Sequence, residues 1–266
     1  MGMTGDRARQ LLVLGSFLFA IVVNAAANIV PFNGQTTGEI SDRFEVFVTP
    51  AGYVFSIWSL IYIGQLAFVL HTLRPSRRED PLLRRIGLLP VAVAVLNGVW
   101  ICLWHWELFP ATLIVMVALL LSLVLLYRRA GFEETARPGG SRSATERWFV
   151  QVPFSLYLGW ITVATISNVA VVGNWAGVPT FGIAPELIAA VVLAVGLLIA
   201  AAVMLRTADV TYGLVIIWAY LGIVVAEADT LAVPIVAGVS VIVVALLIGA
   251  AVMGRLPRGG RTATAG

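Results

Sequence analysis

The stretch YLGWITVATISN, from Tyr157 to Asn168, places aromatic and amide side chains inside an otherwise apolar segment. In an α-helix, Tyr157, Trp160, Ala164 and Asn168 recur at spacings of three and four residues and therefore share one face. A lipid-facing position would leave the asparagine amide without a partner, which is costly in hydrocarbon. We therefore expect this face to turn toward other helices or toward a ligand.

The composition is that of a polytopic membrane protein. Of the 266 residues, 60% are hydrophobic and 12% are charged, whereas soluble domains contain roughly 25% charged residues. The net charge of +3 comes with 17 arginines and no lysine. These arginines lie in short blocks between apolar runs, which is typical of membrane orientation signals and not of nucleic-acid binding. Cys102 is the only cysteine, so the chain cannot form an intramolecular disulfide.

The sequence contains eight apolar segments of about 20 residues, the length that crosses a hydrocarbon core of about 30 Å. We therefore predict an all-α, multi-pass integral membrane protein whose first partner is the lipid bilayer. The expected spans are residues 11–31, 50–73, 86–106, 108–127, 148–173, 183–205, 210–226 and 231–254.

Arginine placement predicts the orientation of these spans. With the N-terminus in the cytoplasm, only Arg43 falls on the outer side, which satisfies the positive-inside rule. A missed or spurious span would disturb this asymmetry in the later loops. We expect eight transmembrane helices with both termini inside, in a bacterial cell (inner) membrane. The arginines assigned to the inner side are Arg7, Arg9, Arg74, Arg77, Arg78, Arg84, Arg85, Arg128, Arg129, Arg137, Arg142, Arg147, Arg206, Arg255, Arg258 and Arg261.

The chain divides into four parts by composition. We predict a cytoplasmic tail at residues 1–10, a five-helix bundle at 11–175, a three-helix transmembrane extension at 176–254, and a disordered cytoplasmic tail at 255–266. The extension is rich in Ala, Val, Leu and Gly, with small residues four apart that let helix backbones approach closely. We interpret it as a packing scaffold or as the surface of a homodimer. A cleaved signal peptide at the start of the chain is an alternative, because a basic region and an apolar run precede three alanines.

Two other predicted spans each carry an aromatic stripe with one carboxamide. If three helices turn these stripes toward one another, they form an aromatic pocket with amide groups at membrane depth. Plain helix packing accounts for the stripes equally well, because Asn or Gln in a span often makes an interhelical hydrogen bond worth about 0.6 to 2 kcal/mol. The stripes consist of Phe55, Trp58, Tyr62 and Gln65 in the second span and Asn97, Trp100 and Trp104 in the third.

These residues resemble the TspO/MBR family, the tryptophan-rich sensory proteins related to the mitochondrial translocator protein (peripheral benzodiazepine receptor). The resemblance covers roughly residues 11–175. Its most specific part is the fifth span, where an aromatic residue, a tryptophan, an Ala-Thr pair and an asparagine eight positions after the tryptophan match the family pattern. The matching residues are Tyr157, Trp160, Ala164, Thr165 and Asn168 there, Leu96, Asn97 and Trp100 in the third span, and Pro50, Tyr53, Phe55, Trp58, Tyr62 and Gly64 in the second.

The resemblance implies a five-helix bundle with an aromatic cavity that the loop between the first two spans closes. Such a cavity binds flat hydrophobic molecules, either porphyrins and other tetrapyrroles or sterol-like and isoprenoid-like compounds. Indole faces stack on a planar ring system and amides can meet its polar edge. We expect no cofactor other than such a ligand. The candidate ligand-binding residues are Tyr53, Phe55, Trp58, Tyr62, Asn97, Trp100, Trp104, Tyr157, Trp160, Ala164 and Asn168.

Several functions remain open on these grounds. The leading hypothesis is a sensor or carrier, and the alternatives are a porphyrin-degrading photo-oxidative enzyme, an ion-coupled transporter and a scaffold without a pocket. The sequence offers no nucleophile triad, metal cluster or cofactor fingerprint, so we assign no catalytic or metal-binding residue. His71 and His105 fall at span ends, where we interpret them as interfacial. Transport would require carboxylates in mid-span, whereas Glu186, Glu227 and Asp229 fall at the ends of predicted spans.

Overall fold

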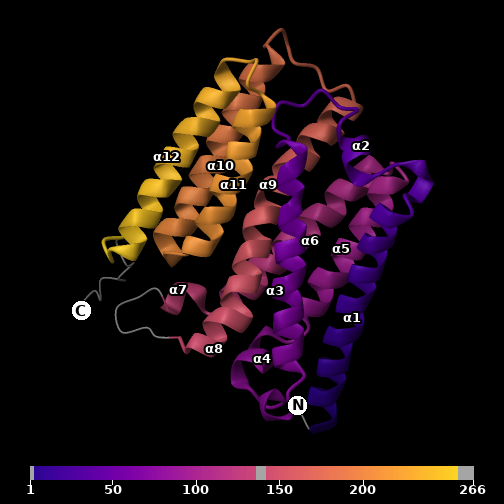
Figure 1. The fold of residues 1–266 in the computed structure, drawn as a ribbon, viewed down its shortest axis with the longest axis vertical. Helices are drawn as coiled ribbons and strands as arrows, with labels where there is room; N and C mark the ends of the chain where they lie inside the picture. Colours follow the sequence, from indigo (N-terminus) through magenta and orange to yellow (C-terminus); the bar gives the residue numbers. More distant parts are fainter. Residues whose placement is uncertain (1–2, 136–141, 257–266) are drawn as a thin grey trace, which may run out of the picture.

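The computed structural model describes residues 3–135 and 142–256, and every regular element in these ranges is a helix. The tail predicted at residues 255–266 lies almost entirely outside the described residues. Within these ranges, eight long apolar helices run up and down in one array (Figure 1). They are α1 (Met3–Ile29), α3 (Ile57–Thr72), α5 (Leu89–His105), α6 (Phe109–Arg129), α9 (Val152–Trp175), α10 (Pro185–Thr207), α11 (Val210–Ala226) and α12 (Ala232–Val252).

Short helical turns connect the long helices. A 3₁₀ turn, η2, leads directly into α3, and a π-helical turn, η4, leads into α9. The remaining turns lie in the loops. The short elements are η1 (Phe32–Gly34), α2 (Thr37–Ser41), η2 (Gly52–Ser56), η3 (Pro75–Arg77), α4 (Pro81–Ile86), α7 (Phe132–Thr135), α8 (Ala144–Glu146) and η4 (Arg147–Gln151).

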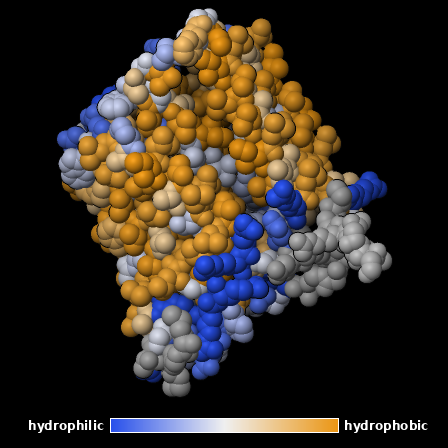
Figure 2. Space-filling model, turned by 180° about the vertical axis from the view of Figure 1, so that it is seen from behind, coloured by the Kyte–Doolittle hydropathy of each residue, from blue (hydrophilic) through white to orange (hydrophobic). Residues whose placement is uncertain are grey.

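The helices have the length and surface of membrane-embedded segments. Six helical segments are long and apolar enough to cross a membrane, and α5 and α11 are shorter apolar helices of 17 residues each. Large apolar side chains lie exposed around the array, among them Ile114, Leu198 and Leu246. Figure 2 shows a predominantly hydrophobic face with hydrophilic residues along its lower edge and at its upper left. The chain is thus an all-α, multi-pass membrane protein.

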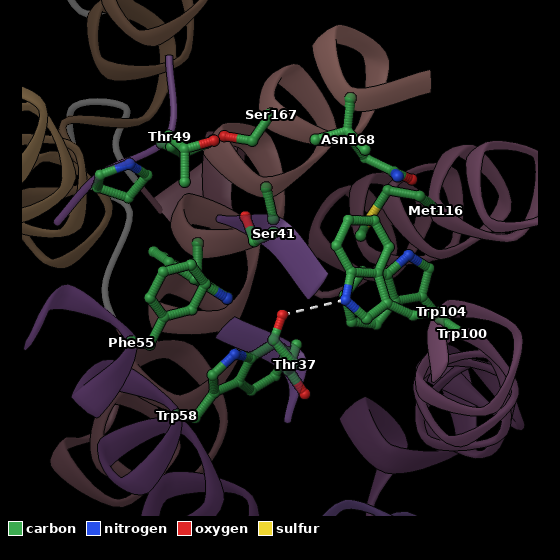
Figure 3. Close-up of a pocket in the computed structure, with 15 residues that line it drawn as sticks. Thr37, Ser41, Thr49, Phe55, Trp58, Trp100, Trp104, Met116, Ser167 and Asn168 are labelled. Carbon is green, nitrogen blue, oxygen red and sulfur yellow. Dashed lines mark hydrogen bonds between the residues drawn. The ribbon is translucent and has the colours of Figure 1, made fainter. Parts of the chain in front are cut away.

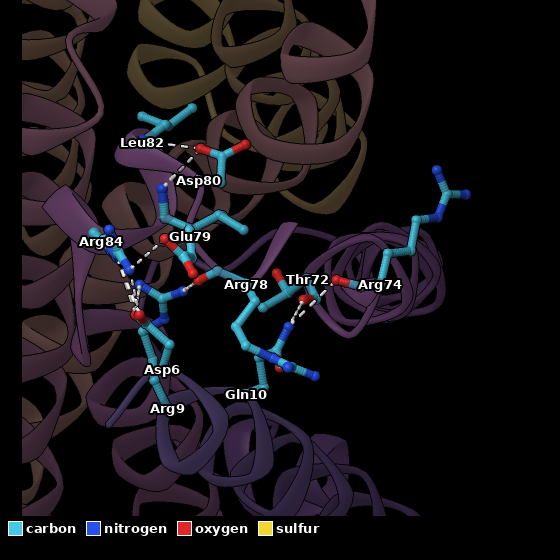
Figure 4. Close-up of polar contacts among 11 residues, drawn as sticks. Asp6, Arg9, Gln10, Thr72, Arg74, Arg78, Glu79, Asp80, Leu82 and Arg84 are labelled. Atoms are coloured by element: carbon cyan, nitrogen blue, oxygen red, sulfur yellow. Dashed lines mark hydrogen bonds and ion pairs between the residues drawn. The ribbon is translucent and has the colours of Figure 1, made fainter. Parts of the chain in front are cut away.

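Polar contacts order the start of α1. The carboxylate of Asp6 lies 2.6 Å from Nη2 of Arg84, and Nε2 of Gln10 donates a hydrogen bond of 2.6 Å to the backbone oxygen of Thr72 (Figure 4). Nη2 of Arg9 also donates to the backbone oxygen of Arg78 over 2.7 Å. Because these contacts hold the first turns of the helix against the α3–α4 connection, residues 3–10 are helical. Residues 3–10 are thus the start of α1, and their position on the cytoplasmic side stays a prediction.

Helix α9 is the centre of the fold. Figure 1 shows it between α3 and α6 on one side and α10 and α11 on the other. Every residue from Pro153 to Val163 is buried, as expected for an apolar helix enclosed on all sides. A Cβ added to Gly159 would lie 2.9 Å from Cβ of Val215 and 3.3 Å from the backbone oxygen of Tyr212. The glycine therefore permits the close approach of α11.

The five-helix bundle and the three-helix extension share one hydrophobic core, which contains buried residues of both. Asp209, 3% exposed, also joins them. Its carboxylate accepts hydrogen bonds from the hydroxyls of Tyr127 on α6, at 2.7 Å, and Ser155 on α9. It also accepts one from the backbone N–H of Tyr212 at 3.1 Å, which caps α11. Hydrogen bonds of this kind offset the cost of burying the carboxylate.

Candidate functional site

A small cavity, called here the inner cavity, lies among α2, α3, α5, α6 and α9 and has a volume of about 50 Å³. Phe55 and Trp58 line one side, and Trp100 and Trp104 line the other (Figure 3). The remaining lining residues are Thr37, Ser41, Thr49, Pro50, Met116, Trp160, Val163, Ala164, Ser167, Asn168 and Val171.

Trp58 connects the aromatic residues of α3 with those of α9. Its ring stacks on Tyr62, with the ring centroids 5.5 Å apart. It also meets Tyr157 and Trp160 edge to face, at centroid distances of 5.9 and 6.1 Å. Phe55 packs edge to face on Trp160 at 5.5 Å. Edge-to-face and offset arrangements are the favoured geometries of aromatic pairs. The stripes of α3 and α9 therefore face each other, with the stripe of α5 across the inner cavity.

Five polar atoms in the lining of the inner cavity are buried and lack a hydrogen-bond partner among the described residues. Buried polar groups are nearly always hydrogen-bonded in proteins, because leaving one unpaired costs free energy. Two of the five are indole N–H donors, one is an amide oxygen acceptor, and two are hydroxyls that can donate or accept. They are Nε1 of Trp100, Nε1 of Trp160, Oδ1 of Asn168, and Oγ1 of Thr37 and Thr49.

Other polar groups of the lining are fixed by hydrogen bonds within the protein. Nδ2 of Asn168 donates to Oγ1 of Thr112 at 3.0 Å, which orients the amide and leaves its oxygen unpaired. Nε1 of Trp104 donates to the backbone oxygen of Thr37 at 3.2 Å, which ties α5 to α2 (Figure 3). The unpaired atoms thus sit on side chains whose positions are set by packing or by a second contact.

Helix α2 contributes Thr37 and Ser41 to the lining of the inner cavity. A capping box begins this helix: the backbone N–H of Thr36 donates to the carboxylate of Glu39 at 2.7 Å, and the N–H of Glu39 donates to Oγ1 of Thr36 at 3.3 Å. The hydrogen bond from the backbone N–H of Thr36 to the carboxylate holds the pKa of Glu39 below its ordinary value. The loop between the first two long helices thus forms part of the cavity wall, and its closing of the cavity, which the family resemblance implies, stays a prediction.

A larger groove of about 450 Å³ adjoins the inner cavity between α1, α2, α3 and α5. The two spaces share Thr37, Phe55, Trp58 and Trp100. The groove is otherwise lined by a mixture of apolar and polar groups, including Asn24, Asn28, Ser59 and Tyr62. The rings of Phe55, Trp58 and Trp100 thus separate the groove from the inner cavity.

Seven of the eleven predicted site residues line the inner cavity. Tyr62 lies in the groove, and together with Asn97 and Tyr157 it lines a further cavity of about 20 Å³. Tyr53 is about half exposed and packs edge to face on Trp218 of α11, 5.4 Å away, so the prediction that it lines the pocket is wrong. The seven are Phe55, Trp58, Trp100, Trp104, Trp160, Ala164 and Asn168.

Sequence reasoning missed several polar residues of the site. The capping-box pattern from Thr36 to Glu39 could have revealed α2. Two asparagines four residues apart, Asn24 and Asn28, could have marked the polar face of α1. Thr49 and Ser167 carry no comparable signal, because nothing near them in the sequence shows that they face a cavity.

The histidines and acidic residues that a metal site or ion-coupled transport would need do not line the inner cavity. His71 and His105 lie in the last turns of α3 and α5 and are buried: the ring of His71 stacks on Phe149 at 5.0 Å, and Nδ1 of His105 lies 2.8 Å from the backbone oxygen of Ile101. Within residues 3–135 and 142–256, no three His, Cys, Asp or Glu residues are grouped to hold a metal ion. Glu186 lies in the first turn of α10, Glu227 lies at the end of α11, and Asp229 lies in the loop that follows α11.

Comparison with protein families gives one match. A family model described as TSPO-like protein matches residues 10–253. The match extends the resemblance seen over residues 11–175 and includes the three-helix extension. Neither curated proteins nor solved structures give a significant match. Since the family model matches well over half of the chain, from within α1 to the end of α12, the chain belongs to the TSPO-like protein family.

Proposed function

We propose that this protein is a sensor or carrier that binds a flat hydrophobic molecule with polar groups at its edge. The observation that carries the proposal is the set of five unpartnered polar atoms in an otherwise aromatic and apolar lining. Trp100 and Trp160 offer N–H donors to carboxylate or carbonyl oxygens, and Asn168 offers an acceptor. A porphyrin or another tetrapyrrole presents both a face for the indoles and oxygens for the donors. An isoprenoid-like or sterol-like alcohol is the alternative ligand class.

The volumes of the inner cavity and the groove support one location for the proposed ligand. Pockets for small molecules measure about 300–1,000 Å³, so the inner cavity of about 50 Å³ cannot hold a macrocycle as it stands. The groove of about 450 Å³ is large enough. We place the body of the ligand in the groove, with its polar edge reaching the inner cavity past Phe55, Trp58 and Trp100. Those rings must turn to admit it.

Titration of the detergent-solubilised protein with protoporphyrin IX tests the proposal. We expect saturable quenching of tryptophan fluorescence and weaker binding by Trp160→Phe, which keeps an aromatic ring but removes the N–H donor. Trp148→Phe is the matched control, because Trp148 is 64% exposed and lies outside the lining. An absence of saturable quenching would contradict porphyrin binding, and equal affinities for the wild type and Trp160→Phe would contradict the role of the indole N–H.

We also propose that all eight long helices cross a bacterial cell membrane, with both termini in the cytoplasm. The arginine distribution supports this orientation. In a Cys102→Ser background, single cysteines at Ser76, Leu108, Arg206 and Asp229 flank the two short helices α5 and α11. We expect a membrane-impermeant maleimide to label Leu108→Cys and Asp229→Cys in intact spheroplasts, and Ser76→Cys and Arg206→Cys only after permeabilisation. Labelling of both flanks of one helix from the same side would contradict its crossing.

A further inference from the structure

The extension contacts the segment that forms one side of the inner cavity. This segment, residues 49–56, connects the outer loop to α3 and includes η2. Pro50 and Phe55 line the inner cavity. Tyr53 faces α11 instead, with its ring edge to face on Trp218 at 5.4 Å. The same short segment therefore contacts the cavity on one side and α11 on the other.

Two hydrogen bonds fix this segment to α11. The backbone N–H of Ala51 donates to the backbone oxygen of Gly222 at 3.1 Å. Nε1 of Trp218 donates to the backbone oxygen of Val54 at 3.1 Å. Ala51 directly precedes the 3₁₀ turn and Val54 lies within it, so the extension bonds to the segment at two points. Bonds to a neighbouring rigid helix fix the position of the segment as well as its conformation.

Gly222 allows the segment to lie directly against α11. A Cβ added at this position would overlap Cγ2 of Val54 and lie 3.1 Å from Cβ of Pro50. Val54 is completely buried, and its side chain is short and β-branched, so it has few ways to move aside. Any side chain at position 222 must therefore displace the segment, and with it Pro50 and Phe55, relative to α9.

We propose that α11 is a positioning element for the ligand site, in which Trp218 and Gly222 set the place of residues 50–56 and so the shape of the inner cavity. Neither residue lines the inner cavity. They act through Pro50 and Phe55. The inference rests on the proposed function for its effect on the ligand, but the position of the segment can be measured without a ligand.

The test compares Gly222→Ala and Trp218→Phe with Gly249→Ala on α12, where an added Cβ meets nothing within 4 Å. Hydrogen–deuterium exchange of the full-length protein reports on the segment, and protoporphyrin IX titration reports on the site. We expect faster exchange at residues 49–56 in both α11 variants and unchanged exchange at residues 157–168. The affinity of Gly222→Ala for protoporphyrin IX should be at least about fivefold weaker than that of the wild type, which is the size of a typical coupling between sites. Gly249→Ala should match the wild type in both measurements.

The two readouts separate this inference from the proposed function. If the wild type does not bind protoporphyrin IX, the proposed porphyrin ligand is wrong, and exchange at residues 49–56 alone decides whether α11 positions the segment. Unchanged exchange in both α11 variants overturns the inference. Faster exchange with unchanged affinity overturns its effect on the ligand. Trp218→Phe guards against misfolding of Gly222→Ala, because it keeps an aromatic ring against Tyr53 and removes the hydrogen bond to Val54.

Discussion

Asn24 on α1 donates a hydrogen bond from its side-chain Nδ2 to Oδ1 of Asn97 on α5, over 2.8 Å. Both side chains are buried, and the second N–H of Asn24 is used by the backbone oxygen of Ala20, also at 2.8 Å. The bond therefore joins two helices at buried positions. It also holds α1 in place beside the groove, of which Asn24 is part.

A double-mutant cycle should show that these two asparagines stabilise the fold jointly. We expect Asn24→Ala and Asn97→Ala each to lower the free energy of unfolding, with a coupling of about 0.6 to 2 kcal/mol between them. Reversible unfolding in mixed micelles measures the four free energies. Asn28→Ala is the control, because its exposed amide bonds only to the backbone of its own helix, at Asn24. Strictly additive effects would contradict an energetic role for the bond.

The two stacked tryptophans of α5 should respond in opposite ways to the same substitution. Nε1 of Trp104 donates to Thr37, whereas Nε1 of Trp100 is buried and has no partner in the described part of the chain. Trp104→Phe should therefore lower the stability of the apo protein by about 0.5 to 1.5 kcal/mol, the net worth of a hydrogen bond. Trp100→Phe removes an unsatisfied donor, so we expect it to leave stability unchanged or raised while weakening ligand binding.

Thermal unfolding and porphyrin titration of both variants check this contrast. The phenylalanine ring keeps most of the stacking area in each case, so the difference isolates the N–H groups. A loss of stability in Trp100→Phe equal to that in Trp104→Phe would show that the Trp100 N–H is paired in the apo protein. That result would remove Trp100 from the set of atoms that carry the proposed function.

The helices and the aromatic stripes were predictable because both depend on local periodicity. Apolar length marks a span, and a spacing of three and four residues places side chains such as Trp58 and Trp160 on one face of a helix. Tyr53 was misplaced for a physical reason. Residues 52–56 form a 3₁₀ turn, with three residues per turn, and not the first turn of α3. The side chain of Tyr53 consequently points to α11 and away from the cavity.

The volume of the cavity and the contacts of its surroundings could not be predicted from spacing. They depend on which residues contact one another in the folded chain. For example, the carboxylate of Asp6 forms an ion pair with Arg84, 78 positions later in the sequence. Asp209 is a second case. Its place just before an apolar span resembles an ordinary helix cap, and only the packing of α6 and α9 against it shows that the carboxylate is buried.

Acidification should loosen α2 through Glu39. The pKa of this carboxyl is below 4.5 in the folded protein because it accepts a hydrogen bond from the backbone of Thr36. A carboxyl whose pKa falls on folding stabilises the native state above its unfolded pKa, and this contribution disappears as the pH falls from about 4.5 through the folded pKa. We expect the protection factors of residues 36–42, corrected for intrinsic exchange rates, to fall over this range.

Glu39→Gln provides the reference for this experiment, since glutamine can accept the same hydrogen bond but does not titrate in this range. Its protection factors at residues 36–42 should show a smaller dependence on pH than those of the wild type. Glu45→Gln, on the exposed part of the same loop, should behave as the wild type does. A pH profile that is the same in Glu39→Gln and the wild type would assign the effect to another group.

Asp209→Asn should weaken the attachment of the extension to the bundle. The substituted amide keeps an oxygen for the N–H of Tyr212, but its NH₂ group cannot accept the hydroxyl protons of Tyr127 and Ser155. Because the site is buried, we expect a loss of about 1 to 3 kcal/mol in the free energy of unfolding, the cost of leaving buried groups unpaired. Tyr127→Phe removes one donor and leaves the others in place, so its cost should be smaller. Asp229→Asn, in an exposed loop, should leave the free energy of unfolding unchanged. Equal stabilities of Asp209→Asn and Asp229→Asn would show that the buried carboxylate does not stabilise the contact between the bundle and the extension.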